Sequence, residues 1–445
     1  MTHSAASRPR VGAGWFTLFT LAWLALWAVQ LVPIQLLLPL QLDTPDDADG
    51  WIAGVIWSGV VLAAGGVASI VVGPIAGALS DRTRSRLGRR RPWALGGSWL
   101  AAAALVATAF ADGPWLIGAA WIGVSVGFAA ASAAFTALIA DQLTTQRGAA
   151  SGAVGSAQAL GLVVGVGVIA LLELDIVTGY LLLAVLMAVV GTVAALLLPD
   201  PVVDVSPTPA RHPDARHPDA RHPDTRDATA HEPTGHPARP RRLEALHDPD
   251  FLWVVSGRLV VNIGNGLGTA LLLFFLLYGL RRPAAGAEDD LLLLILVYTV
   301  FVVLASVAGG WLSDRTQRRT GIVVASALIQ AVAAVVLAVA PAYGTTLIAG
   351  ALLGVGYGAF TSVGLALATD LLPSEADHAR DLGIVNVAAN LGQLLGPLVG
   401  ALLVAAVGGF WLLFAAAAAF SVAGALMTAR VRPARSSRSP VAARR

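Results

Sequence analysis

Long apolar stretches, separated by short polar segments, make up most of this 445-residue chain. Each stretch has about the 20 residues that an α-helix needs to cross the hydrocarbon core of a bilayer. Membrane helices are expected at 15–40, 51–79, 93–111, 114–140, 149–172 and 178–198, and again at 251–280, 290–312, 322–340, 345–372, 382–407 and 410–427. The pattern predicts an all-α membrane protein with twelve transmembrane helices and both termini on one side.

A proline-rich polar segment, residues 199–249, separates the first six helices from the second six. It contains three tandem copies of Arg-His-Pro-Asp and too few apolar residues to fold. We therefore expect an N-terminal bundle (1–198), a disordered cytoplasmic linker (199–249) and a C-terminal bundle with a short basic tail (250–445). A metal site at His212, His217 and His222 is the less favoured reading, because an unstructured segment does not preorganise ligands.

Composition narrows the class of protein. Hydrophobic residues make up 56% of the chain and charged residues 13%, with a mean hydropathy of +0.74. A soluble protein of this size would need more charge on its surface. The arginines form short clusters between apolar runs rather than one basic face, so nucleic acid is not an expected partner. The chain has no cysteine, which excludes disulfides and thiolate metal sites.

A basic segment, GALSDRTRSRLGRRRP at 77–92, lies between the second and third helices and is partly repeated between the eighth and ninth. Eight identities in a window of twelve recur 233 positions later. The repeated residues are Gly77, Leu79, Ser80, Asp81, Arg82, Thr83, Arg86 and Gly88, which match Gly310, Leu312, Ser313, Asp314, Arg315, Thr316, Arg319 and Gly321. The repeat predicts two pseudo-symmetric six-helix bundles, an arrangement typical of secondary transporters.

The distribution of arginine predicts the orientation. Of the 29 basic residues only Arg258, Arg281 and Arg282 fall outside the termini, the linker and the loops on the same side, which leaves 26 on that side. Loops rich in arginine stay in the cytoplasm. We expect a multi-pass protein of the cell (inner) membrane with both termini cytoplasmic.

The residues from Gly77 to Trp93, G-x-L-S-D-R-T-R-S-R-x-G-R-R-R-P-W, resemble the signature loop of the major facilitator superfamily. The ending RSR-x-G-RRRPW is similar to that of the glycoside-pentoside-hexuronide and sucrose-type symporters, as are ALIAD at 137–141 and GIVNVAANLGQLLGP at 383–397. The resemblance implies alternating access, with charged clusters that lock the cytoplasmic side shut.

The charges of the repeated loop allow a physical reading of this gate. Arg82 and Arg86 can reach an acid on another helix, and Asp141 is the natural candidate. By the repeat, equivalent contacts are expected beside Asp370. The predicted cytoplasmic gate is Gly77, Asp81, Arg82, Arg86, Asp141, Gly310, Asp314, Arg315, Arg319 and Asp370. The alternative, that the arginines only mark topology, leaves the repeated motif unexplained.

Polar residues within the expected helices are mostly neutral. Asn386, Asn390 and Gln393 are spaced by four and three, which places three amides on one helix face. Amides both donate and accept hydrogen bonds, as a neutral polyhydroxylated ligand requires. The predicted substrate-binding residues are Trp27, Gln30, Asn262, Asn265, Asn386, Asn390 and Gln393. The alternative is that the amides only cross-link helices and that the tryptophan only marks the membrane interface.

Arg258 is the one basic residue expected inside a helix, where an unpaired charge costs about 3 kcal/mol or more. Asp370 is expected at a similar depth, which suggests an ion pair; snorkelling to solvent is the alternative. In the melibiose-type symporters that the chain resembles, two aspartates near the second-helix proline bind sodium. Aligned on Pro74, this chain has Gly73 and Ser69 there, so no sodium site is expected and Asp141 and Asp370 are the candidate proton carriers.

Together these features predict a monomeric secondary active transporter in the lipid bilayer that moves a small neutral polyhydroxylated solute, a sugar, by alternating access, with protons as the candidate coupling ion. The alternative is an exporter of amphipathic drugs, which would have aliphatic and aromatic cavity walls instead of amides. An enzyme is not expected, because no cluster of acid, base, nucleophile or metal ligands lies at membrane depth. No catalytic residue, metal or cofactor is assigned.

Overall fold

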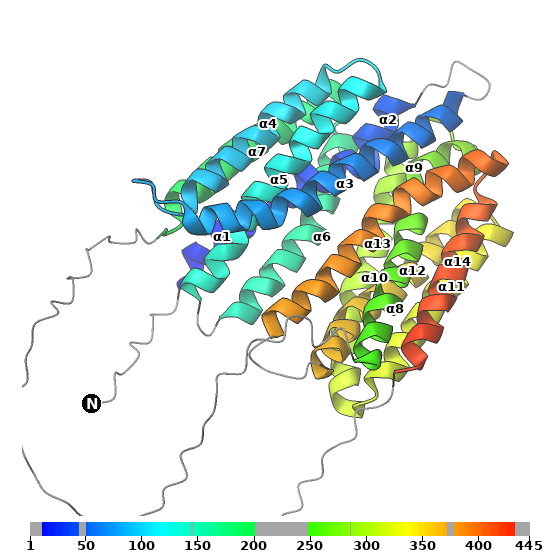
Figure 1. Cartoon of the computed structure of the whole chain (residues 1–445). Helices are drawn as coiled ribbons and strands as arrows, with labels where there is room; N and C mark the ends of the chain where they lie inside the picture. Colours follow the sequence, from blue (N-terminus) through cyan, green and yellow to red (C-terminus); the bar gives the residue numbers. More distant parts are fainter. Residues whose placement is uncertain are drawn as a thin grey trace, which may run out of the picture.

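The computed structural model describes residues 11–43, 50–143, 146–200, 248–284, 286–371 and 378–431 (Figure 1). The side chains of 140, 147, 378–384 and 386 are outside this description, as are the linker predicted to be disordered, from residue 201 to 247, and the basic tail.

Six membrane-length spans make up the N-terminal half of the described chain. This half contains α1 (Ala13–Val32), the π-helical turn η1 (Pro33–Leu37), α2 (Leu38–Leu42), α3 (Gly50–Arg82), α4 (Arg91–Ala109), α5 (Pro114–Gln142), α6 (Arg147–Leu171) and α7 (Ile176–Leu197). The π-helical turn begins at Pro33, which lacks the N–H that a regular α-helix would use. α1, η1 and α2 together form a single span.

The C-terminal half contains α8 (Pro249–Ala270), α9 (Leu272–Phe274), the π-helical turn η3 (Phe275–Gly279), α10 (Ala287–Thr316), α11 (Arg319–Val339), α12 (Tyr343–Asp370), α13 (His378–Val407) and α14 (Trp411–Ala429). Among the described residues, eleven helices are long and apolar enough to cross a membrane, and a bent pair provides the twelfth. The twelve spans begin and end within four residues of the expected ranges.

The seventh span is broken, which the sequence analysis did not anticipate. α8 and the segment from Leu272 to Gly279 meet at an angle of 46°. Leu271 leaves the helical conformation, with φ −110° and ψ 26°. No proline is present to signal a kink, but glycines at 264, 266 and 268 lower the helix propensity just before the break.

The two halves lie side by side, with α3 and α13 running along each other between them (Figure 1). We call one end of the molecule the arginine end, which carries Asp81, Arg90, Asp141, Arg319 and Asp370. The opposite end, which carries Asp43, Asp175 and residues 288–290, is the acidic end. Near the acidic end the buried core of the N-terminal half continues through Leu276, Leu291 and Leu294 of the C-terminal half.

Contacts between α3 and α13 show where the halves separate. A Cβ atom at Gly59 would lie 2.6 Å from the Cβ of Ala401, and Gly66 packs directly against Leu394. The same antiparallel register would next bring Gly73 opposite Val387. However, nothing lies within 4 Å of a Cβ placed at Gly73, and Val387 is 53% exposed. The halves are therefore in contact from the acidic end to mid-membrane and diverge toward the arginine end.

Candidate functional site

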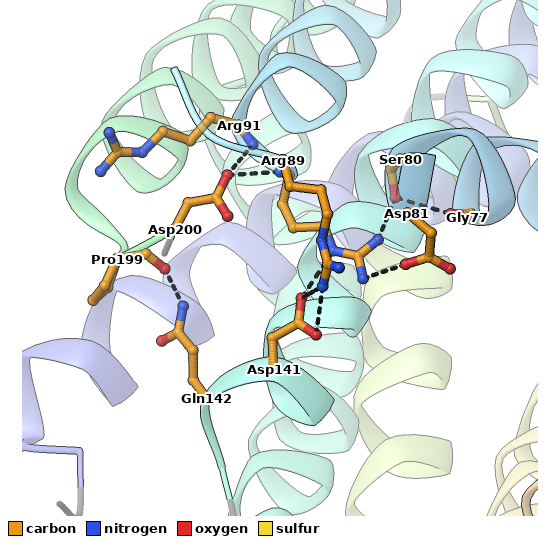
Figure 2. Close-up of polar contacts among 10 residues, drawn as sticks. Gly77, Ser80, Asp81, Arg89, Arg91, Asp141, Gln142, Pro199 and Asp200 are labelled. Atoms are coloured by element: carbon orange, nitrogen blue, oxygen red, sulfur yellow. Dashed lines mark hydrogen bonds and ion pairs between the residues drawn. The ribbon is translucent and has the colours of Figure 1, made fainter. Parts of the chain in front are cut away.

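Arg90 connects three elements at the arginine end of the N-terminal half. Its partners Ser80, Asp81 and Asp141 are labelled in Figure 2. Nη2 of Arg90 lies 2.5 Å from Oδ1 of Asp81, where α3 ends, and its Nε lies 2.9 Å from Oδ2 of Asp141, where α5 ends. Its Nη1 donates to Oγ of Ser80 at 2.5 Å. Arg89 donates from Nη2 to both carboxylate oxygens of Asp141, at 2.9 Å each. We call Asp81, Arg89, Arg90 and Asp141 the arginine-end cluster.

The arginines of this cluster differ from those predicted. Arg82 and Arg86 were expected to bind Asp141, but both side chains are exposed, and Arg89 and Arg90 bind it instead. The chain leaves α3 at Arg82 and reverses through Gly88, whose φ of 110° favours glycine. The reversal aims the residues before α4, rather than those after α3, at the end of α5.

Mutual hydrogen bonding determines the charge state of the cluster. Burial raises the pKa of Asp141, but the hydrogen bonds from Arg90 and Arg89 outweigh it and leave the pKa below its ordinary value. Burial lowers the pKa of Arg90, and the bonds to Asp141 and Asp81 reverse that shift and raise the pKa. Asp141 is therefore ionised at neutral pH in this conformation, which argues against proton binding there in this state.

Asp200 is a further member of this region that the sequence analysis missed. Its Oδ2 accepts hydrogen bonds from the backbone N–H groups of Arg90, at 2.6 Å, and Arg91, at 2.9 Å (Figure 2). A carboxylate here stabilises the positive N-terminal end of α4. Asp200 follows α7 directly, so it ties the end of the sixth span to the basic loop. The sequence feature that could have identified Asp200 is an acidic residue flanked by two prolines just after a membrane helix.

The C-terminal half repeats this arrangement only in part. Arg319 forms the expected ion pair with Asp370. Arg315 instead lies over the ring of Trp311, 5.3 Å from its centroid, and Asp314 is exposed. The glycines assigned to the gate, Gly77 and Gly310, lie within the last two turns of α3 and α10.

Five polar side chains from four helices meet at mid-membrane in the C-terminal half. Gln393 donates from Nε2 to Oδ1 of Asn265 at 3.1 Å, to Oη of Tyr357 at 3.3 Å and to Oδ1 of Asn262 at 3.4 Å. Asn265 donates to Oη of Tyr298 at 3.5 Å. We call these five residues the amide cluster; it joins α8, α10, α12 and α13. Tyr357 and Tyr298 are not among the binding residues predicted from the sequence.

Exposure distinguishes the members of this cluster. Asn262 and Asn265 are 1% and 2% exposed, and both are engaged with neighbouring side chains, so in this conformation they cross-link helices. Gln393 is half-buried, and Asn390, one turn away on α13, is exposed. Both lie beside Leu394, which contacts α3, so this part of α13 borders the gap between the halves. The side chain of Asn386, the third predicted amide, is outside the described residues.

In the N-terminal half, Trp27 and Gln30 lie on α1. The ring of Trp27 contacts those of Trp23, at 6.1 Å, and Phe128, at 5.5 Å between centroids. Nε1 of Trp27 and Oε1 of Gln30 are buried without a hydrogen-bond partner in the part of the chain that the structure describes. Buried polar atoms normally have partners, so a ligand hydroxyl can fill this role by accepting from the Trp27 N–H or by donating to the Gln30 oxygen.

At the acidic end, Tyr278 binds across the two halves. Its hydroxyl donates to Asp43, with Oη 2.8 Å from Oδ1 and 2.7 Å from Oδ2. Trp51 stacks on Tyr278, at 4.9 Å, and on Phe410, at 5.7 Å between ring centroids. Asp43 and Trp51 belong to the N-terminal half, and Tyr278 and Phe410 to the C-terminal half. We call these four residues the acidic-end latch; the sequence analysis did not identify it.

The sequence matches the family model of the Major Facilitator Superfamily over residues 18–287 and 261–445. The chain belongs to the major facilitator superfamily. It is therefore a multi-pass membrane transporter rather than an enzyme. A search of curated proteins gave no match.

Solved structures of superfamily members have the same fold. A point mutant of the nucleoside transporter NupG superposes with a TM-score of 0.70 at 12% identity, covering 94% of this chain and 98% of NupG. A bacterial homologue of the human lysosomal transporter Spinster, inward-facing and unoccupied, gives a TM-score of 0.63 at 15% identity, with 94% and 96% covered. Its inward-facing, occupied structure gives 0.66 at 15% identity, with 93% and 95% covered. These likenesses show the fold alone.

The sequence predicts an ion pair between Arg258 and Asp370. In the structure this pair does not form. Asp370 binds Arg319, and the guanidinium of Arg258 lies over the ring of Phe360, 6.0 Å from its centroid. A Cβ atom at Gly364 would lie 3.2 Å from Nη1 of Arg258. The guanidinium is thus level with Gly364, about 9 Å along α12 from Asp370, which explains why the pair does not form.

Proposed function

We propose that this major facilitator superfamily protein is a secondary active transporter of a small neutral polyhydroxylated solute, such as a sugar, working by alternating access, and that it belongs with the sugar symporters that its basic loop resembles. The proposal rests on the amide face of α13 formed by Asn390, which is exposed, and Gln393, which is half-buried, because this face borders the gap between the halves. Trp27 and Gln30 lie in the first span at a depth similar to that of Asn262 in the seventh. Amides, hydroxyls and an aromatic face suit a hydroxyl-rich ring.

We infer that the arginine end is cytoplasmic, because most arginines lie there. The conformation described is then open to the cytoplasm and closed outside by the acidic-end latch. Because the chain has no cysteine, a thiol reagent labels only a cysteine that is introduced, and the labelling reports whether that position is accessible from the side of the reagent. Ala284→Cys should react with an impermeant thiol reagent on intact cells, whereas Ala149→Cys should react only after permeabilisation. The reverse pattern would invert the orientation.

Uptake into proteoliposomes tests the solute class and the driving force. We expect at least one labelled sugar of a panel to accumulate under a proton gradient, with no added effect of sodium, because Gly73 and Ser69 replace the cation-binding aspartates. Asn390→Ala and Gln393→Ala should each raise KM about tenfold, the loss of one solute hydrogen bond. Gln317→Ala, an exposed amide at the arginine end, is the matched control.

Sodium-stimulated accumulation would show the assignment of the driving ion to be wrong. Efflux of amphipathic compounds without any sugar uptake would favour the drug exporter, for which the contact of Trp27 with Phe128 is the supporting observation. An unchanged KM in both Asn390→Ala and Gln393→Ala would show that the amide face of α13 does not bind the solute.

A further inference from the structure

Arg258 is a buried charge that the proposed transport site does not use. Its side chain is 9% exposed, and both Nε and Nη1 lack a hydrogen-bond partner among the described residues. A guanidinium keeps its proton in proteins, so burial does not neutralise it. A buried charge left without a partner is strongly destabilising, which implies that something compensates it.

The neighbouring side chains do not supply that compensation. Asp370, the acid at the end of the same bundle, is bound to Arg319. The ring of Phe360, 6.0 Å from the guanidinium carbon, lies at the limit of a cation–π contact. Tyr357 binds Asn262 and Gln393 through its hydroxyl. No carboxylate contacts Arg258 within the described part of the chain.

A small cavity lies against this guanidinium, where α8, α11, α12 and α14 meet near the arginine end. Its volume is about 10 Å³, and it is lined by Arg258, Gly364, Thr428 and apolar side chains. Thr428 donates its hydroxyl hydrogen to the carbonyl of Gly424 at 2.9 Å, so Arg258 and not Thr428 supplies the hydrogen-bond donors of the cavity. A cavity of this size holds about one water-sized particle.

We propose that this cavity binds one small inorganic anion, chloride in the simplest case, through the Nη1–H groups of Arg258, the buried donors beside Gly364. The donors present require a ligand that accepts hydrogen bonds, and the uncompensated charge requires that it be negative. The volume excludes phosphate and any carboxylated solute, which leaves a monatomic ion. A water molecule would satisfy the donors but not the charge. This site is separate from the amide cluster and does not depend on what the protein transports.

Thermal unfolding of the purified full-length protein in detergent tests the site without any transport assay. We expect a saturable rise in melting temperature of about 2 °C or more when chloride replaces gluconate at constant ionic strength. Bromide should act in the same way. Arg258→Gln should abolish the rise. Arg430→Gln, which removes an exposed arginine that lies over Trp253 at the same end, should retain it.

Gly364→Ala keeps the charge and provides a second test should Arg258→Gln fail to fold. Its new Cβ, 3.2 Å from Nη1, narrows the cavity and should raise the chloride concentration at half-effect at least severalfold. A wild-type protein that is insensitive to halide would mean that water alone fills the cavity, and would overturn the proposal. A full chloride response in Arg258→Gln would overturn it as well, because the ion would then bind elsewhere.

Discussion

Replacing Asp141 by asparagine should slow solute transport at least tenfold while changing solute affinity much less. The substitution weakens the charge-assisted hydrogen bonds that this carboxylate, 20% exposed, accepts from Arg89 and Arg90. Such bonds are worth about 1.5–3 kcal/mol each. Because the arginine-end cluster lies far along the helices from the amide cluster, turnover should change and KM should not. Both are measured in proteoliposomes.

Two exposed arginines of the same loop provide the control for this prediction. Arg82→Gln and Arg86→Gln remove a charge from the loop without breaking the contacts of Asp141, so both should transport like the wild type. Asp81→Asn should have an intermediate effect, because Asp81 is 59% exposed and binds Arg90 alone among the cluster's arginines. Intact turnover in Asp141→Asn, or equal slowing in the two arginine variants, would contradict a gating role for these contacts.

The same contacts have a predictable pH dependence. The pKa of Asp141 is lowered in the folded protein, so its contribution to stability is fully present above the ordinary aspartate pKa and is lost only as pH falls through the lowered value. The difference in melting temperature between wild type and Asp141→Asn should therefore be constant from pH 8 to about pH 5.

Tyr278→Phe should shift the conformational equilibrium at least tenfold away from the state that is closed at the acidic end. It removes the hydroxyl that donates to both oxygens of Asp43 and leaves the ring stacked on Trp51. Loss of a hydrogen bond to a charged group costs about 1.5–3 kcal/mol. Each 1.4 kcal/mol is about a tenfold change in an equilibrium constant.

Distances between paired spin labels measure this shift. A pair at Asp112 and Ala342 reports on the acidic end, and a pair at Ala149 and Arg318 on the arginine end; all four side chains are exposed. In Tyr278→Phe the first distance should lengthen and the second should shorten. Tyr180→Phe is the matched control, because its hydroxyl is buried without a partner among the described residues. Unchanged distances in Tyr278→Phe would show that the latch does not hold the acidic end closed.

The sequence by itself determined the twelve spans and their division into two halves. A bilayer offers no hydrogen-bond partner to the backbone, so apolar length alone predicts each helix to within a few residues. The internal repeat predicted the pairing of Arg319 with Asp370, because two acids and two basic loops occupy equivalent places in the halves. The sequence also predicted Asn262, Asn265 and Gln393 as site residues, because polar residues inside apolar helices are rare.

Only the tertiary structure decided which polar groups meet. The choice of Arg89 and Arg90 over Arg82 and Arg86 depends on the direction in which the chain leaves Gly88, which composition does not encode. Tyr278 and Asp43 lie 235 residues apart, and their contact depends on how the two halves are docked. Spacing along a helix specifies a face, but the neighbour of that face is specified by packing between helices. Arg258 faces a small cavity rather than Asp370 for this reason: the rotation of α8 and the height of α12 place Gly364, not the acid, beside its guanidinium.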